Sequence, residues 1–312
     1  MDLLYNGFII KNSMKNQLSY DGRTYKFGIT IDAENYIVKY PKNSVTSLYS
    51  EYFASRFISL LGIKAHSVWL GTHIDSHNKK NSVVILKDFT SMNIVLHAFK
   101  GTRQSSEDTD ISNKTYTYDD VLYLISKHTK LGSNDKQRML VRFWQMFICD
   151  AILGNRDRHQ GNWGYLVTPK GYKPAPIYDN GASLFPDVER VFSGFTKDEY
   201  QFLAERSEKF PASLFQMERA DGSIKRTNYY EMFSDLRINK TFAHQVKILK
   251  EKVGFEGIYR RACRVAQQSN SVIPSEYVKF YIMIICMRYL HIVERKPLKK
   301  AYTILKERMK DG

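Results

Sequence analysis

Residues 154–162 read Gly-Asn-Arg-Asp-Arg-His-Gln-Gly-Asn, and residues 177–181 read Ile-Tyr-Asp-Asn-Gly. Asp157 and Asn162 stand five positions apart, and Asp179 follows Asn162 by seventeen positions. Enzymes that transfer a phosphoryl group need a carboxylate near the attacking hydroxyl and oxygen ligands that hold Mg²⁺ against the phosphates. The two stretches therefore predict the acidic half of a phosphotransfer site, and with it the fold.

The composition indicates a globular chain with a sizeable core and two lobes. Of 312 residues, 43% are hydrophobic and 13% aromatic, which excludes a disordered sequence. The 47 Lys and Arg against 32 Asp and Glu give a formal net charge of +15. This charge favours an acidic or otherwise anionic partner surface, although a solvated basic surface explains it equally well. The basic clusters carry no nucleic-acid-binding motif.

Nothing in the sequence indicates a secreted or membrane-spanning protein. The first residues lack a basic segment followed by a long apolar one, so no secretory signal is recognised. The longest apolar run, 280–287, is too short to be a transmembrane segment. Cys149, Cys263 and Cys286 have neither metal-site spacing nor the even number typical of a disulfide framework. We therefore expect a soluble, cytoplasmic protein.

The first ninety residues read as a small sheet with one helix. Strands are expected at 23–29, 36–40, 68–72 and 82–86, where β-branched and aromatic residues lie between turn formers. A helix is expected from Ser47 to Leu61, with Gly62 at its C-terminal end. We assign residues 1–90 to an N-terminal lobe.

The remainder, residues 91–312, reads as a mostly helical C-terminal lobe. Helices are expected at 118–131, 135–153, 197–206, 240–253, 258–268, 275–294 and 298–309. The second of them is apolar nearly all round in its second half and is expected to be buried. Short strands are expected at 162–167 and 176–179, and residues 100–114 read as a loop. A sheet lobe, a helical lobe and a site where they meet define a two-lobe α+β architecture.

The spacing of the acidic motifs decides how they are interpreted. Alone, Asp157 would more often be a loop carboxylate paired with a neighbouring arginine, and Asp-Asn-Gly is a common turn. The interval from Asp157 to Asn162, however, is that of the protein-kinase catalytic loop, where the aspartate accepts the hydroxyl proton and the asparagine holds Mg²⁺. Asp179 opens Asp-Asn-Gly much as the metal-binding aspartate of kinases opens Asp-Phe-Gly. Asp157 is therefore the predicted base, and Asn162 and Asp179 are the predicted metal ligands.

These motifs, GNRDRHQGNWG at 154–164 and YDNG at 178–181, resemble those of the HipA-like serine/threonine kinases. The resemblance extends upstream and covers most of residues 20–185. It implies a protein-kinase-like fold with a small β-rich N-terminal lobe for the nucleotide and a larger helical catalytic lobe. It also implies an autophosphorylating enzyme that uses ATP and Mg²⁺ to phosphorylate Ser or Thr in a protein substrate. Export and entry into host cells is a second location implied by the resemblance alone.

The resemblance also assigns residues to the nucleotide. They are Lys39, Glu51, Gly22, Gly28, Leu86 and Phe89. Lys39 would contact the phosphates and Glu51 would pair with it, although an interval of twelve is short and both could be ordinary surface residues. The two glycines would belong to a phosphate loop that departs from G-x-G-x-x-G. Backbone near Leu86 and Phe89 would meet the adenine.

His159 leaves the base and the acceptor open. In the kinase interpretation His159 supports the loop through hydrogen bonds, and Asp157, His159 and Asn162 form the catalytic set. Lipid kinases of the phosphatidylinositol type carry a similar Asp-Arg-His-x-x-Asn, in which the histidine is a candidate base. A phosphoinositide kinase is therefore one alternative, and a nucleotide-binding regulatory or toxin-type module without turnover is another.

The segment after Asp179, residues 182–196, lies where a kinase activation segment would lie. It carries three candidate hydroxyls, Ser183, Ser193 and Thr196. Because serines are ordinary in loops, the sequence alone does not favour a regulatory role for any of them.

Overall fold

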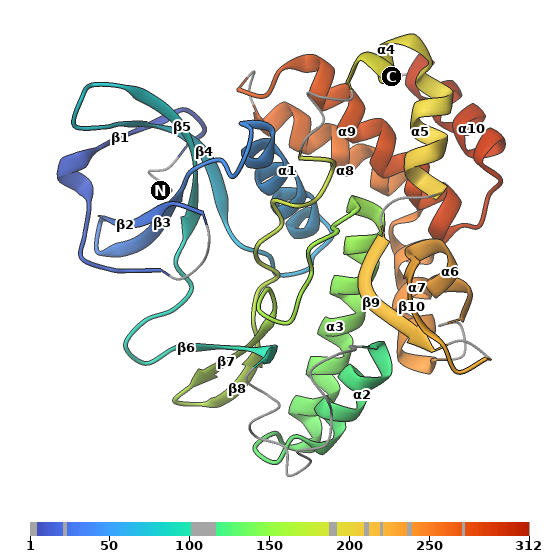
Figure 1. Ribbon diagram of the computed structural model, residues 1–312, viewed down its shortest axis with the longest axis horizontal. Coiled ribbons are helices and arrows are strands. Elements are labelled where there is room, and N and C mark those ends of the chain that lie inside the picture. Colours follow the sequence, from blue (N-terminus) through green and yellow to red (C-terminus); the bar gives the residue numbers. More distant parts are fainter. Residues whose placement is uncertain are drawn as a thin grey trace.

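The computed structural model describes residues 5–20, 24–100, 117–186, 192–208, 212–218, 221–235, 239–269 and 272–311. These residues form a curled five-stranded sheet on the N-terminal side and a larger helical lobe, with one helix between them (Figure 1). This is the predicted two-lobe α+β architecture.

The five-stranded sheet forms most of the N-terminal lobe. Its strands are β1 (Phe8–Lys11), β2 (Lys26–Ile31), β3 (Glu34–Lys39), β4 (Val68–Ile74) and β5 (Lys80–Lys87). Their order is β1-β4-β5-β3-β2, and only β1 and β4 are parallel neighbours. The register places Lys39, the last residue of β3, between Lys26 of β2 and Val84 of β5.

The two faces of this sheet bury different residues because successive side chains alternate. One face forms a separate core of Ile10, Ile29, Val38, Val83 and Ile85. The other face contributes Val84 and Leu86 to the main core of the molecule. Helix α1 (Thr46–Leu60) covers this second face.

Helix α1 is fixed to the helical lobe as well as to the sheet. The Tyr52 hydroxyl donates to the Gln268 carbonyl at 3.0 Å, and Arg261 Nε donates to the Leu60 carbonyl at 2.7 Å. Gln268 and Arg261 both belong to α8 (Gly254–Ser269). The helix therefore holds its side chains in a position set by both lobes.

The helical lobe is built around α3 and α9. Its helices are α2 (Tyr118–Lys127), α3 (Ser133–Leu153), α4 (Phe192–Lys197), α5 (Glu199–Glu208), α6 (Tyr229–Asp235), α7 (Lys240–Lys252), α8, α9 (Ser275–Arg288) and α10 (Leu298–Lys310). A π-helical turn, η5 (Tyr289–Val293), continues α9. The second half of α3 is buried, as its apolar pattern predicted.

No helix in the described part of the chain is both long and apolar enough to cross a membrane. The cytoplasmic location and the export alternative stay predictions.

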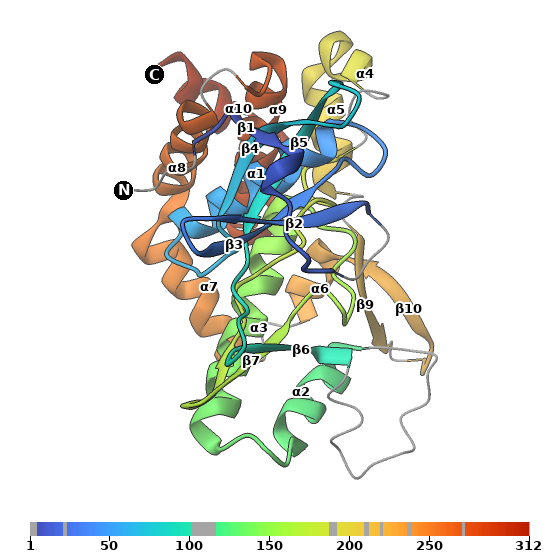
Figure 2. The same ribbon diagram turned by 90° about the vertical axis from the view of Figure 1, so that its left-hand side faces the viewer.

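Two small sheets complete this lobe. They are β6 (Val95–Ala98), β7 (Gly164–Thr168) and β8 (Gly171–Pro174), and the pair β9 (Ala212–Glu218) and β10 (Ile224–Asn228). The first lies beside α2 and α3 in both views (Figures 1 and 2). Its strand β7 begins two residues after Asn162, so the sheet fixes the end of the Asp157 loop. The division of the chain at residue 90 stays a prediction.

Several expected elements differ from those observed. The expected strand at 176–179 is wrong: Ile177 makes only an isolated bridge, to Ala65, while Gly171–Pro174 pairs with β7. Pro174 and Pro176 cannot donate to a ladder, which explains why the strand ends there. The expected helix at 197–206 is α5, shifted by two residues. Strands β1, β6, β9 and β10 and helices α4 and α6 were not predicted. Residues 101–114 of the expected loop lie outside the described residues.

Candidate active site

Lys39, Glu51 and Asp179 meet where the sheet lobe joins the helical lobe. The Lys39 ammonium nitrogen lies 3.1 Å from Glu51 Oε2 and 2.7 Å from Asp179 Oδ1. Lys39 ends β3, Glu51 lies in α1, and Asp179 follows the bridge at Ile177. The register of β3 and the double anchoring of α1 thus bring together residues that are up to 140 positions apart.

The charges of this cluster stabilise one another. Burial alone would lower the pKa of Lys39, but the carboxylates of Glu51 and Asp179 raise it above its ordinary value. Burial alone would raise the pKa of Asp179, but the charges of Lys39 and Arg158 lower it. Both groups are therefore charged at neutral pH. The Asp179 side chain is 42% exposed, so its carboxylate stays accessible to a ligand.

The loop after α3 holds the backbone of Asp157 from two sides. Helix α3 ends at Gly154, whose left-handed φ of +73° turns the chain. The Asn155 side-chain oxygen accepts the Asp157 N–H at 3.0 Å, and the Asn162 amide donates to the Asp157 carbonyl at 2.9 Å. Among the described residues, none donates to the Asp157 carboxylate or to the Asn162 amide oxygen. The loop is fixed while both oxygen-bearing groups remain free.

Arg158 joins this loop to the segment around Asp179. Its fully buried guanidinium binds both Asp150 oxygens, at 2.8 and 3.0 Å. It also donates to the Asn162 carbonyl at 2.7 Å, the Tyr178 carbonyl at 2.5 Å and Asn180 Oδ1 at 2.7 Å. The partner of the Arg158 charge is thus the buried carboxylate of Asp150.

Asn180 connects the same segment to α1. Asp179 has a left-handed φ of +55°, after which the Asn180 N–H donates to Glu51 Oε1 at 2.8 Å and its side chain donates to Ser55 at 2.9 Å. Glu51 thus binds Lys39 with one oxygen and Asn180 with the other. A Cβ at Gly181 would lie 2.9 Å from Glu51 Oε2, so a glycine permits this close approach.

His159 lies on the surface of the loop. Its ring nitrogen Nδ1 accepts the N–H of Gly161 at 3.0 Å, and the ring is exposed. The Asn162 N–H donates to the His159 carbonyl at 2.9 Å. The ring and the backbone of this histidine therefore both stabilise the turn that leads to Asn162.

Of the two expected phosphate-loop glycines, the structure describes Gly28, and no contact among the described residues brings it to the Lys39 cluster. Gly28 lies inside β2, opposite Ile37. A Cβ at Gly28 would collide with the side chain of Asn16. The backbone N–H of Asn16 donates to the Gly28 carbonyl at 3.0 Å. Close packing against Asn16 thus explains this glycine without a ligand. Gly22 lies outside the described residues.

The expected adenine region lies at the end of β5. Leu86 is buried between Ile37 and Val68 of the neighbouring strands. The Phe89 ring contacts the rings of His66, at 4.9 Å, and Tyr178, at 5.8 Å, so this residue lies next to the Asp179 segment. Burial lowers the pKa of His66, whose Nε2 hydrogen-bonds the Lys87 carbonyl.

Two residues of this network were missed in the sequence. Asp150 is a carboxylate within the buried, apolar half of α3, and such a group requires a partner. That signal would have predicted its pairing with Arg158. Asn180, which stands where kinases have phenylalanine, gave no comparable signal because asparagine is common in turns.

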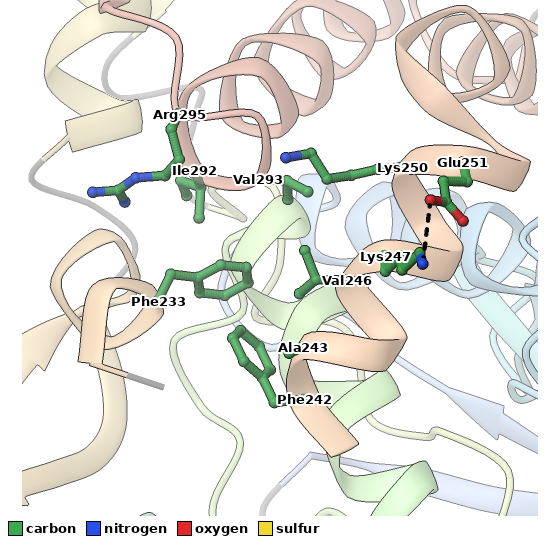
Figure 3. Close-up of a pocket in the computed structure, with 10 residues that line it drawn as sticks. All are labelled: Phe233, Phe242, Ala243, Val246, Lys247, Lys250, Glu251, Ile292, Val293 and Arg295. Carbon is green, nitrogen blue, oxygen red and sulfur yellow. Dashed lines mark ion pairs between the residues drawn. The ribbon is translucent and has the colours of Figure 1, made fainter. Parts of the chain in front are cut away.

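A pocket of about 460 Å³ lies elsewhere, between α6, α7 and η5 (Figure 3). Its apolar lining is Phe233, Phe242, Ala243, Val246, Ile292 and Val293, and Lys247, Lys250, Glu251 and Arg295 surround it. It contains none of the predicted site residues. The pocket and the Lys39 cluster are therefore separate features of the molecule.

Residues 14–246 match the family model described as HipA-like C-terminal domain. Serine/threonine-protein kinase CtkA of Helicobacter pylori is 32% identical over 219 residues, which span 67% of this chain and 64% of that relative. The crystal structure of the H. pylori proinflammatory kinase CtkA matches with a TM-score of 0.76 and 24% identity, over 96% of this chain and 98% of that chain. A Shewanella oneidensis HipA–HipB–operator DNA complex matches with a TM-score of 0.49 and 15% identity, over 92% of this chain and 67% of that chain.

The match to the CtkA structure confirms the predicted protein-kinase-like fold. The family model spans well over half of the chain and includes Lys39, Asp157, Asn162 and Asp179. Its span also includes the two motifs on which the resemblance was based. The chain therefore belongs to the HipA-like family.

Proposed function

We propose that this chain is a protein kinase that transfers the γ-phosphoryl group of ATP to serine or threonine, with Mg²⁺, and that its own hydroxyls are among the acceptors. The observation that carries the proposal is the Lys39 ammonium held between Glu51 and Asp179 at 3.1 and 2.7 Å. A lysine fixed in this way presents a preorganised positive charge to phosphates. Membership of the HipA-like family and similarity to a protein named as a serine/threonine kinase support it.

Asp157 takes the role of base. A base must reach the hydroxyl proton by a hydrogen bond, and no described residue competes for this carboxylate. In the transfer, the acceptor hydroxyl oxygen forms a bond to the γ-phosphorus of ATP, and the bond from that phosphorus to the bridging oxygen of ADP breaks. The hydroxyl proton passes to Asp157.

His159 takes a supporting role. Because its Nδ1 accepts the Gly161 N–H, the neutral ring carries its proton on Nε2 and has no free lone pair for a hydroxyl proton. This favours Asp157 as the base over His159. The same observation favours a protein kinase over the lipid-kinase alternative, in which the histidine would be the base.

Asn162 and Asp179 fit a magnesium ion. Both offer the oxygen donors that Mg²⁺ prefers. The Asn162 amide oxygen accepts no hydrogen bond from the described residues, and one Asp179 oxygen is bound to Lys39 while the carboxylate stays partly exposed. The bound ion would neutralise phosphate charge, which is its general role in such enzymes.

The proposal is tested by incubating the protein with γ-labelled ATP and Mg²⁺ and locating the label by mass spectrometry. Asp157→Ala and Asp179→Ala are expected to fold and to lose transfer by roughly 10²–10⁴-fold or more. Asp311→Ala, an exposed carboxylate near the end of α10, is the matched control and should keep wild-type activity. Circular dichroism and thermal unfolding establish that each variant is folded.

Three results would contradict the proposal. Wild-type transfer by a folded Asp157→Ala protein would remove the base assignment. Label that enters phosphoinositide vesicles but no protein would make the chain a lipid kinase. Calorimetry that detects no Mg²⁺-dependent ATP binding would leave a regulatory module without turnover.

A further inference from the structure

Two arginines lie behind the segment that follows Asp179. They are Arg288, the last residue of α9, and Arg206, in α5. The Phe185 ring lies next to both, with its centroid 5.0 Å from Arg288 Cζ and 5.7 Å from Arg206 Cζ. Arg288 also packs against Gly154, so closely that a Cβ there would overlap its guanidinium. The pair therefore touches both the segment after Asp179 and the start of the Asp157 loop.

Arg288 is a buried charge without a counter-ion. Its side chain is fully buried, and no carboxylate among the described residues lies within ion-pair distance. Its Nε and one terminal nitrogen donate to the Arg206 carbonyl, at 3.4 and 3.2 Å, and the other terminal nitrogen has no partner. Burial and the neighbouring charge of Arg206 hold the pKa of Arg288 far below its usual range. An uncompensated buried guanidinium is strongly unfavourable.

Arg206 is poorly neutralised as well. Its nearest carboxylate is that of its chain neighbour Glu205, at 3.8 Å, and this side chain is half exposed. The Nε of Arg206 is buried without a partner, and the guanidinium stacks 3.5 Å above the Phe202 ring. Two adjacent guanidinium groups thus share an environment of aromatic rings and carbonyls.

The chain next to these arginines is strained. Leu184 and Phe185 both have left-handed φ angles, +52° and +55°, which bulky side chains rarely adopt. The Leu184 N–H donates to the Leu153 carbonyl at 2.8 Å, and the buried Ser183 hydroxyl has no partner. Strain and unpaired buried donors together indicate that this arrangement has a purpose other than stability.

A merely structural role does not explain two arginines. A single neutral donor would serve the Arg206 carbonyl without burying a charge. A pair of guanidinium groups offers several parallel N–H donors and two positive charges, which are the features that bind a phosphate dianion.

We propose that Arg206 and Arg288 form a binding site for a phosphate group, which enters when the Phe185 ring moves away from them. The same chemistry serves two sources: a phosphate ester on the hydroxyl of Ser183, two residues before Phe185 in the chain, or free inorganic phosphate. The first source rests on the proposed kinase activity, in which the serine oxygen gains the γ-phosphoryl group, ADP leaves and the proton passes to the base. The second source does not require that activity.

The site is tested by thermal unfolding in sodium phosphate and in sodium chloride of equal ionic strength. Phosphate at about ten times its dissociation constant should raise the midpoint of the wild type by roughly 2–4 °C. Arg288→Met, which removes the buried charge and leaves an unbranched apolar side chain, should melt above the wild type in chloride and gain nothing from phosphate. Arg308→Met, which removes an arginine paired with Glu256, is the control and should gain as much as the wild type.

Two results would overturn the proposal: a wild-type midpoint that phosphate does not change, or an Arg288→Met protein that gains as much as the wild type. If Arg288→Met does not fold, Arg206→Gln takes its place, because that side chain is partly exposed. Its phosphate gain should also be lost, and a full gain would equally overturn the site.

The source is identified with protein incubated with ATP and Mg²⁺ and then freed of both. If Ser183 carries the phosphate, mass spectrometry locates it there, the midpoint is already raised in chloride, and added phosphate raises it no further. If added phosphate still raises the midpoint, free phosphate occupies the site. A chain that fails to label while phosphate still stabilises it would contradict the kinase proposal and leave the phosphate site supported.

Discussion

Arg158 and Arg288 are both fully buried arginines of the helical lobe, and their surroundings are opposite. Arg158 binds both oxygens of Asp150 and three further acceptors, and the pKa of its guanidinium is raised despite burial. Arg288 has one carbonyl, one ring and an unpaired nitrogen, and its pKa is lowered. The first arginine lies under the Asp157 loop, and the second lies behind the segment after Asp179.

The difference between the surroundings of Arg158 and Arg288 indicates that the Asp157 loop is held in one arrangement, whereas the segment after Asp179 can change its arrangement. A buried charge whose donors are all satisfied holds its neighbours in one arrangement. Arg158 does this for Asn162, which is a predicted metal ligand, and for Asn180, which follows the other predicted ligand, Asp179, in the chain. A buried charge without a counter-ion lowers stability. Strained and unsatisfied buried groups cluster at functional sites. Arg288 fits this second case.

The largest expected effect comes from removing the carboxylate partner of Arg158, so that this arginine becomes an unpaired buried charge like Arg288. Asp150→Ala leaves Arg158 buried without its carboxylate, so the free energy of unfolding should fall by about 3–5 kcal/mol. Equilibrium unfolding in urea measures the change. Asp135→Ala, which removes the partly exposed partner of the exposed Arg138 in the same helix, should cost less than about 1 kcal/mol. Equal losses in the two variants would show that the Arg158 network is not what stabilises this lobe.

Patterns with a short repeat were predictable from the sequence. The helical pattern located α3 and α7 to within a few residues, because an apolar face repeats every three to four positions over several turns. The site motifs were equally visible, because Asp157, Asn162 and Asp179 lie on loops at characteristic intervals. Strands such as β1 and β6 were missed because four residues carry too little alternation to stand out.

Long-range pairing was the part that the sequence could not supply. Nothing local in Asp150 or Arg158 specifies that they meet, although a carboxylate in an apolar helix signals that some partner exists. The absence of a partner for Arg288 is harder still to foresee, since it depends on which side chains of α5 and of the segment after Asp179 fail to reach it. Which buried charges find a partner depends on the packing of the folded core, and a short stretch of sequence does not contain that information.

Gly154 begins the Asp157 loop and also contacts Arg288. Substitutions at this glycine therefore show whether the loop and Arg288 are energetically coupled. Its φ of +73° and its contact with Arg288 both oppose a side chain. Gly154→Ala should therefore lower the free energy of unfolding by about 1–3 kcal/mol. Gly62→Ala is the matched control: it has a similar φ of +79° but open space around it, so it should lose only about 1 kcal/mol.

Combining Gly154→Ala with Arg288→Met should recover the part of the loss that arises from the collision with the guanidinium. The double-mutant cycle should then give a coupling of roughly 0.5–3 kcal/mol. Urea unfolding of the four proteins measures it. Additive effects would mean that Arg288 and the start of the Asp157 loop are energetically independent.

The smallest expected effect concerns Lys39 and Asp179, whose ion pair is only partly buried. Because the pKa of Asp179 is lowered, its stabilising contribution is present above its unfolded value of about 3.9 and is lost as the pH falls through its folded value. Because the pKa of Lys39 is raised, its contribution is present below its unfolded value of about 10.4 and is lost as the pH rises through its folded value.

The difference in unfolding free energy between the wild type and Asp179→Asn should accordingly form a plateau between about pH 5 and pH 10 and shrink on both sides. With the Asp179 side chain 42% exposed, solvent screening should limit the plateau to about 1 kcal/mol or less, and added salt should lower it further. Urea unfolding across this pH range, with Asp311→Asn as the exposed control, measures it. A difference that is independent of pH would mean that the pair contributes through packing and not through charge, in contrast to the fully buried pair of Asp150 and Arg158.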